Sequence, residues 1–313
     1  MTIILKDGQN IPPEAYGSVT ALGNFDGVHR GHAYLIKQLR QHSKGKRLSV
    51  VTFEPHPREF FSRDQKKFRL TNADERNKAL SDLGIDYIFQ YTFDAQFAAL
   101  SGYDFIHKIL HNQLDTKHVV CGEQFAFGNN RVGSVRYLGF ELKKLKIGFS
   151  AVKPLTDSSG IISSSRIRHL LKTGHPHEAQ NLLGRAWAIE NIVQHGEQRG
   201  RTLGFPTANL SLGNHLEPKC GVYAVTVQLP NATIYNGVAN IGYRPTIGVQ
   251  PVCSLEVHIF DFDADLYGKL LKITFHHFIR EEKKYNSIAA LKMQIEKDAQ
   301  QSKYFLDTMN VKK

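Results

Sequence analysis

Two histidines at a glycine-rich turn are the first residues in this sequence whose types and spacing could do chemistry. His29 and His32 lie three residues apart in the run GNFDGVHRGH at 23–32, which follows an apolar strand pattern and contains three evenly spaced glycines. Glycines let the backbone approach a ligand closely, and the amides at the start of a helix favour phosphate. Because both imidazoles can point toward one anion, we expect this loop to bind and act on a polyphosphate.

A second phosphate-binding pattern is the run ISSSRIR at 162–168. Serine hydroxyls and unpaired backbone amides open a helix there, and Arg166 adds a planar fork of hydrogen-bond donors. An N-capped surface helix without a ligand is the alternative explanation.

Oxygen-bearing side chains in the second half of the sequence form a metal-binding pattern. In the run GRTLGFPTAN at 200–209, a glycine-rich loop leads into a proline turn, after which Thr207 and Asn209 face the same side of an extended segment. Magnesium ions that bridge nucleotide phosphates take such oxygen ligands, with water completing the shell. Threonine and asparagine after a proline also occur in ordinary loops, so that alternative stays open.

Two charged residues further along the chain stand out from their surroundings. Glu256 interrupts an apolar strand pattern, where either a function or a surface-facing position explains a carboxylate. Arg280 lies in the charged run IREEKKY at 279–285, for which a solvated surface is the alternative to a binding role.

The elements that must position these residues change character along the chain. From 18 to about 184, short apolar runs alternate with helical patterns, which is typical of an α/β domain with a largely parallel sheet. Strands are predicted at 18–23, 48–53, 86–89, 118–121 and 149–152, and helices at 32–42, 72–83, 102–112 and 163–172.

After 185, strand patterns are separated by glycine, proline and asparagine, which predicts a small antiparallel barrel. The predicted strands lie at 187–194, 222–229, 233–240, 254–260 and 270–279, and a terminal helix at 287–307. We predict two domains, 1–184 and 185–313, each with its own core.

Composition narrows the possible partners and the compartment. A formal net charge of +11 favours nucleic acid, a membrane surface or phosphorylated small molecules, but the basic residues are spread over several short groups, which argues against nucleic acid. The longest apolar runs fall short of the about 20 residues that cross a bilayer, and the first residues lack a secretory-signal pattern. Three widely spaced cysteines without a CxxC pair are most simply reduced thiols. We therefore expect a cytoplasmic protein that binds small phosphorylated molecules and neither nucleic acid nor membrane, with an unknown oligomeric state.

The motifs also carry a family resemblance. The string GNFDGVHRGH resembles the FAD-synthetase branch of the HxGH nucleotidyltransferases, and FEPHP at 53–57 and ISSSRIR are similar to further segments of that family. GRTLGFPTAN, GVYAV at 221–225, NIGYRPT at 240–246 and LEVH at 255–258 resemble riboflavin kinase in content and order. Nearly the whole chain thus resembles the bifunctional bacterial-type riboflavin kinase/FAD synthetases.

This resemblance implies a Rossmann-like α/β nucleotidyltransferase domain followed by a small antiparallel β-barrel kinase domain with a C-terminal helix. It implies that riboflavin and ATP give FMN and ADP in the barrel, and that FMN and ATP then give FAD and pyrophosphate in the α/β domain.

The resemblance also implies roles for single residues. Glu256 is the expected general base of the kinase, His29 and His32 are expected to stabilise the transferring nucleotide, and magnesium is expected on Thr207 and Asn209. Contacts with ATP and its phosphates are expected from Gly23, Asn24, Phe25, Gly31, Ser164, Arg166, Arg201, Leu203 and Gly204. Contacts with the flavin are expected from Gln124 and Arg280.

One position departs from the family pattern. In GEQFAFG at 122–128, the family usually carries asparagine or aspartate where this chain has Gln124. One alternative is therefore a kinase whose first domain binds nucleotide without transferring adenylate, which FAD and pyrophosphate formation would exclude. Another is a basic nucleic-acid-binding or regulatory protein built on these folds, which salt-sensitive binding to RNA or DNA would reveal.

Overall fold

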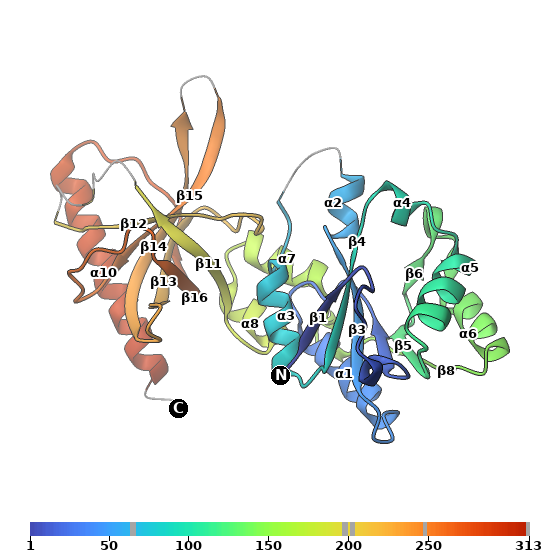
Figure 1. Ribbon diagram of the computed structural model, residues 1–313. Coiled ribbons are helices and arrows are strands. Elements are labelled where there is room, and N and C mark those ends of the chain that lie inside the picture. The colour runs from blue at the N-terminus through green and yellow to red at the C-terminus, as the bar shows by residue number, and fades with distance from the viewer. Residues whose placement is uncertain (63–66, 196–199, 201–203, 247–248, 311–313) are drawn as a thin grey trace. The chain divides into compact units, whose positions relative to one another are not determined.

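The computed structural model describes residues 1–62, 67–195, 200, 204–246 and 249–310. The chain forms two compact units (Figure 1), one made of 1–66 and 71–164 and the other of 67–70 and 165–313. The first unit contains a six-stranded parallel sheet, and the second contains a closed antiparallel barrel and the C-terminal helix. The predicted fold class is confirmed.

The sheet of the first unit has the strand order β1-β4-β3-β2-β5-β8, and every pairing is parallel. Its strands are β1 (Ile3–Lys6), β2 (Val19–Leu22), β3 (Leu48–Glu54), β4 (Tyr87–Thr92), β5 (His118–Gly122) and β8 (Gly148–Val152). The sequence predicted all of these except the edge strand β1. The strands that follow β2 in sequence lie first on one side of it, as β3 and β4, and then on the other side, as β5 and β8. Ligands of open α/β sheets bind at the carboxyl ends of the strands where the strand order reverses in this way. The loop that carries His29 and His32 begins there.

Helices cover both faces of this sheet. On one face, α1 (Arg30–Gln41) and α3 (Ala73–Asp82) bury Ile36, Leu39 and Leu80. On the other, the π-helix η2 (Phe105–Gln113) and α6 (Val135–Lys144) bury Ile106 and Leu138. The predicted helix at 102–112 is therefore α5 (Gly102–Asp104) continued as a π-helix, and α6 was not predicted.

The shorter elements of the first unit lie in its connections. They are η1 (Pro13–Ala15), α2 (Pro57–Phe61), α4 (Ala95–Ala98), β6 (Ala126–Phe127), η3 (Asn129–Arg131), β7 (Gly133–Ser134), β9 (Thr156–Asp157) and β10 (Gly160–Ile161). A further helix, α7 (Ser164–Lys172), begins at the last residue of this unit.

The barrel of the second unit has the strand order β11-β12-β15-β14-β13-β16 and closes by pairing β16 with β11. Its strands are β11 (Trp187–Gln194), β12 (Ala208–Ser211), β13 (Gly221–Gln228), β14 (Ile234–Thr246), β15 (Val249–Ile259) and β16 (Leu270–Arg280). The five predicted strands are confirmed, and β12 is an addition. The unit also contains α8 (Pro176–Leu183) and α10 (Ile288–Asn310), which packs on the barrel through Ala299 against Val222, Val238 and Phe260.

A short segment from the middle of the α/β sequence belongs to the second unit. The Trp187 indole donates a hydrogen bond to the Leu70 carbonyl oxygen (2.9 Å), and the Leu216 amide donates one to the Arg69 carbonyl oxygen (2.8 Å). Leu70 is fully buried. The second unit is therefore completed by residues far from it in sequence, while the division of activities at 184/185 stays a prediction.

Within the described residues, no helix has both the length and the apolar character that a membrane crossing requires.

Two stacked imidazoles at the amino end of the sheet make stability depend on pH. The rings of His118 and His42 lie 4.0 Å apart, and both contact the Ser150 hydroxyl, at 3.0 and 3.1 Å. The pKa of His118 is lowered to about 4, mainly by burial and to a smaller extent by electrostatic interaction with the nearby His42 and Lys44. Its unfolded-state pKa is about 6.5, so its contribution to stability is complete above that pH and is lost as the pH falls toward 4.

We expect His118→Gln to remove part of this acid sensitivity, because glutamine does not titrate. Between pH 6.5 and 4.5 the variant should lose less unfolding free energy than the wild type, by on the order of 1–2 kcal/mol. Urea unfolding followed by circular dichroism at several pH values measures the unfolding free energy of each variant. His169→Gln, at an exposed position, is the control. Equal pH slopes for the wild type and His118→Gln would contradict the assignment.

Candidate active sites

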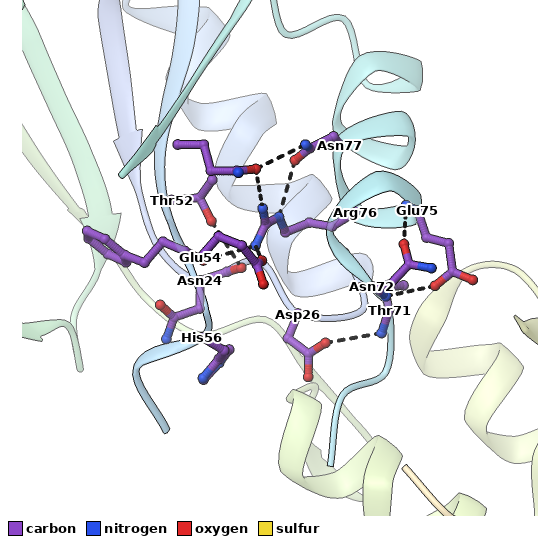
Figure 2. A network of polar contacts seen from close by, with 12 residues as sticks. Asn24, Asp26, Thr52, Glu54, His56, Thr71, Asn72, Glu75, Arg76 and Asn77 are labelled. Atoms are coloured by element: carbon purple, nitrogen blue, oxygen red, sulfur yellow. Dashed lines mark hydrogen bonds and ion pairs between the residues drawn. The ribbon is translucent and has the colours of Figure 1, made fainter. Parts of the chain in front are cut away.

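The loop after β2 is held in a strained conformation beside β3 and α3. Phe25 and Val28 have positive φ angles of 53° and 38°, which bulky and β-branched residues rarely adopt. The Thr71 amide donates to Asp26 Oδ1 (3.2 Å), and the Gly27 amide donates to Thr71 Oγ1 (3.0 Å), as Figure 2 shows for the first pair. Such strain persists only where surrounding structure enforces it, and it concentrates at functional sites.

The loop is also fixed from two further directions. Thr52 Oγ1 donates to the Asn24 carbonyl oxygen (3.4 Å), which ties the loop to β3. Ser164 Oγ donates to the Asp26 carbonyl oxygen (2.9 Å), so the second predicted phosphate motif begins against the first. Arg166 lies two residues further along α7 and is partly buried.

The two histidines of the loop are stacked on each other at the start of α1. Their ring centroids lie 3.7 Å apart with an interplanar angle of 18°. Each Nδ1 accepts the backbone N–H of the other residue, at 3.3 Å, which makes a reciprocal cap of the helix. Because Nδ1 accepts in both rings, Nε2 carries the proton and is the nitrogen that can donate to an anion.

A side chain at Gly31, between the histidines, would be tightly crowded. A Cβ atom there would lie 3.0 Å from the His29 ring and 3.1 Å from the Ile162 carbonyl oxygen. The ring of Phe25 is buried and packs against the His32 ring, with 5.2 Å between centroids. Phe25 can therefore contribute to nucleotide binding through its backbone and not through its ring.

A group of aromatic rings that the sequence analysis did not single out follows the FEPHP segment. Phe60 and Phe61 of α2 are 39% and 64% exposed, and both rings contact Phe93, with centroids 5.5 and 5.7 Å apart. The consecutive phenylalanines in a polar stretch were the available signal. Gln124 is exposed in the turn after β5.

In the barrel, strand register places Glu256 in a polar row. Glu256 of β15 is paired with Asn209 of β12 on one side and with Asn240 of β14 on the other. Residues paired in this way present their side chains on the same face of the sheet. The neighbouring Leu255 and Val257 are completely buried, so the polar row lies on the outer face of the barrel wall.

Asn240 was not among the predicted site residues, because only the strand order makes it a neighbour of Glu256. Its amide nitrogen also donates to Glu282 Oε1, at 3.2 Å, so a second carboxylate lies beside the row. Glu282 lies within the predicted flavin-side run at 279–285.

Of the two predicted metal ligands, Thr207 lies in the loop that leads into β12 and Asn209 lies in β12 itself. Asn209 Nδ2 donates to the Thr207 carbonyl oxygen (3.4 Å), which turns the amide oxygen away from that carbonyl. His258 Nδ1 lies 2.8 Å from the Pro206 carbonyl oxygen and anchors the turn to β15. Gly204 has a φ of 87°, a left-handed value that favours glycine. Arg201 and Leu203, two predicted ATP contacts, lie outside the described residues.

Arg280, predicted to contact flavin, ends β16 and is paired with α10. Its guanidinium donates to Asp298 through Nε and Nη2, with Nη2 at 2.6 Å from Oδ2, and its Nη1 donates to the Glu281 carbonyl oxygen (2.8 Å). Asp298 is 3% exposed. Arg280 therefore fixes both the terminal helix and the first residue of the segment after β16.

Comparisons with known proteins identify the family of this chain. Residues 11–166 match the family model described as FAD synthetase, and residues 183–306 match the one described as riboflavin kinase. A Bacillus subtilis (strain 168) protein described as bifunctional riboflavin kinase/FMN adenylyltransferase is 41% identical over 304 residues, which cover 94% of this chain and 95% of the relative. An Escherichia coli (strain K12) protein of the same description is 39% identical over 287 residues, 90% of each chain.

A crystal structure from Streptococcus pneumoniae, described as a macrolide-efflux protein, matches with a TM-score of 0.84 and 30% identity over 95% of this chain and 97% of that one. Its description names a different activity, but its fold follows this chain through both units. The two family models match the two halves in order, and the curated relatives match almost from end to end. The chain therefore belongs to the bifunctional riboflavin kinase/FMN adenylyltransferase family.

Proposed function

We propose that the two reactions of this bifunctional enzyme take place at separate sites, riboflavin phosphorylation within 185–313 and FMN adenylylation within 1–184. The polar row of Asn209, Glu256 and Asn240 carries the proposal. It gives the barrel a carboxylate flanked by amides, while the stacked His29 and His32 belong to the other compact unit.

In the kinase reaction, Glu256 accepts the proton of the riboflavin 5′-hydroxyl as that oxygen attacks the γ-phosphorus of ATP. The bond from the γ-phosphorus to the β,γ-bridging oxygen breaks, and ADP leaves. The outward-facing position of Glu256 supports this role, because a base must reach a substrate outside the barrel core.

Thr207 and Asn209 fit a magnesium ion by the chemistry of their donor atoms. A hydroxyl and an amide oxygen are the neutral oxygen ligands that magnesium accepts beside nucleotide phosphates. The ion, when bound, neutralises phosphate charge. The turn at Pro206 lies near Glu256, because Asn209 is the register partner of Glu256 and His258, two residues further along β15, contacts the Pro206 carbonyl oxygen.

In the adenylylation reaction, a phosphate oxygen of FMN attacks the α-phosphorus of ATP. The bond to the α,β-bridging oxygen breaks, and pyrophosphate leaves. The attacking group is already an anion, so no side-chain base is needed. His29 and His32 donate from Nε2 to the transferring phosphate, and the amino end of α1 adds its dipole.

We place the flavin ring of FMN against the exposed rings of Phe60 and Phe61, because flat aromatic ligands stack on such surfaces. Gln124, after β5 at the same edge of the sheet, supplies polar contacts. In the barrel we assign Arg280 to the riboflavin site through the segment at 281–285, which it holds by the Glu281 carbonyl oxygen.

We infer a cytoplasmic enzyme whose partners are these small molecules. Cys121, Cys220 and Cys253 are free thiols, and burial raises the pKa of Cys121 and Cys253 to about 12, which makes them unreactive. The net positive charge suits anionic ATP and FMN.

Product analysis of the full chain with riboflavin, ATP and magnesium tests the proposed function. We expect FMN and ADP first, followed by FAD and pyrophosphate, and we expect a chelator to stop FMN formation until magnesium is restored. FMN without FAD or pyrophosphate would favour the alternative in which the first domain only binds nucleotide. The absence of both products would refute the proposal.

A further inference from the structure

A buried arginine in the first unit has no part in the two reactions as proposed. Arg76, one turn into α3, is 3% exposed. Its Nη1 donates to the Phe53 carbonyl oxygen (3.2 Å) and to Glu54 Oε2 (3.3 Å), and its Nη2 donates to Gln90 Oε1 (3.0 Å). A buried guanidinium is costly unless such partners surround it, as they do here.

The orientation of the guanidinium is fixed from several sides. Arg76 Nε donates to Asn77 Oδ1 (3.3 Å), and Asn77 Nδ2 donates to Gln90 Oε1 (3.2 Å). Figure 2 shows Arg76 reaching from α3 to the end of β3, with Asn77 on one side and Glu54 on the other. The partners lie on α3, β3 and β4, so the arginine joins three elements of the sheet edge.

The same edge borders the nucleotide loop. Phe53 and Glu54 are the last two residues of β3, and Thr52 of the same strand donates to the Asn24 carbonyl oxygen of the loop. Thr71, just before α3, holds Asp26. Thr71 therefore fixes the loop, and Arg76 fixes the end of β3, whose last two residues begin the FEPHP segment.

The ion pair between Arg76 and Glu54 also changes the electrostatic potential beside the nucleotide loop. The carboxylate of Glu54 is 27% exposed beside the loop, and a negative charge there repels an incoming polyphosphate. Arg76 pairs with that carboxylate, so the negative charge of Glu54 is compensated beside the loop.

We propose that Arg76 is a positioning residue for FMN adenylylation, which fixes the end of β3 against the nucleotide loop and compensates the charge of Glu54 where the ATP phosphates approach. The inference rests on the adenylylation site proposed above. Arg76 would act in two ways: its guanidinium hydrogen bonds fix the geometry of the site, and its positive charge compensates Glu54.

The test is a comparison of Arg76→Gln and Arg76→Lys in the full chain, with kcat and KM for ATP measured by pyrophosphate release at saturating FMN. Glutamine loses the fork and the charge, so we expect KM for ATP to rise about tenfold and kcat to fall severalfold. Lysine keeps the charge without the fork, so kcat should fall while KM stays within about twofold of the wild type.

The double variant Arg76→Gln/Glu54→Gln isolates the electrostatic effect, because it removes both charges. We expect it to reverse most of the rise in KM for ATP that Arg76→Gln causes, while kcat stays low. A role in stability alone would lower the fraction of folded enzyme in each variant, which reduces the apparent kcat of both reactions by the same factor and leaves KM for ATP unchanged.

Two controls keep the outcome decisive. Riboflavin phosphorylation by the same molecules reports the folded chain and should stay near wild type. Arg47→Gln removes an exposed arginine that pairs with Asp86 (3.2 Å) at the opposite end of β3, and it should leave both reactions unchanged. Wild-type kcat and KM in Arg76→Gln, or an unchanged KM with a reduced kcat in that variant, would overturn the inference. A wild-type chain that releases no pyrophosphate from FMN and ATP would instead overturn the proposed function.

Discussion

Replacement of Glu256 by glutamine should lower riboflavin phosphorylation by about a hundredfold or more, the effect expected when a general base is removed. Glutamine keeps the size of the side chain and its place between Asn209 and Asn240, so the barrel should fold normally. FAD formation from supplied FMN should persist, because His29 and His32 lie in the other unit. FMN and FAD production, followed separately by chromatography, measure both effects.

Glu190→Gln is the matched control for this experiment. Glu190 is also a barrel carboxylate, on β11, where it lies 3.9 Å from Lys272 and away from the polar row. It should leave phosphorylation near wild type, since partly exposed pairs of this kind contribute little. If Glu256→Gln retains wild-type phosphorylation, Glu256 is not the base.

His29→Asn and His32→Asn should each lower FMN adenylylation by roughly a hundredfold, as for the loss of a donor that stabilises a transferring group. Asparagine is chosen at His29 because it is a strong N-cap residue, which preserves the start of α1 while removing the imidazole. Alanine at the same position should lower adenylylation and, in addition, cost about 1 kcal/mol of stability. Pyrophosphate release from FMN and ATP measures the reaction.

FMN formation by these histidine variants should stay largely intact and serves as the internal control. His42→Asn, at the carboxyl end of the same helix, should retain adenylylation, because it changes a histidine far from the phosphate-facing end. An unchanged rate of pyrophosphate release in both His29→Asn and His32→Asn would remove the histidines from the mechanism.

The sequence alone determined the features that depend on near neighbours. The alternation of apolar strands and helices specified the parallel sheet, and regular turn residues specified the barrel, because hydrophobic periods of 3.6 and 2 are local properties. The proximity of His29 and His32 was likewise predictable, since a spacing of three residues at a helix start brings two side chains together, while the stacking of their rings is a finding of the structure. The edge strand β1 escaped prediction because Ile3 and Ile4 are both half-exposed and give no clear period.

Only the tertiary structure decided which distant residues meet. Glu256 is far from Asn209 in sequence, and no local pattern states that β12 and β14 lie on either side of β15. Strand order follows from closing the barrel around one core, which is a property of all the strands together. The pairing of Arg280 with Asp298 has the same origin, because it required the terminal helix to pack on that side of the barrel.

The buried Arg76 and the segment at 67–70 show this limit most clearly. In the sequence, Arg76 is one of several charged residues on a helix whose period predicts an exposed face, and only the approach of β3 and β4 buries it. Leu70 reads as part of the α/β half, yet its carbonyl oxygen satisfies the Trp187 indole in the second unit. A buried polar group requires a hydrogen-bond partner, and that partner can come from any part of the chain. The sequence therefore shows that a polar side chain needs a partner if it is buried, and only the fold shows which residue provides it.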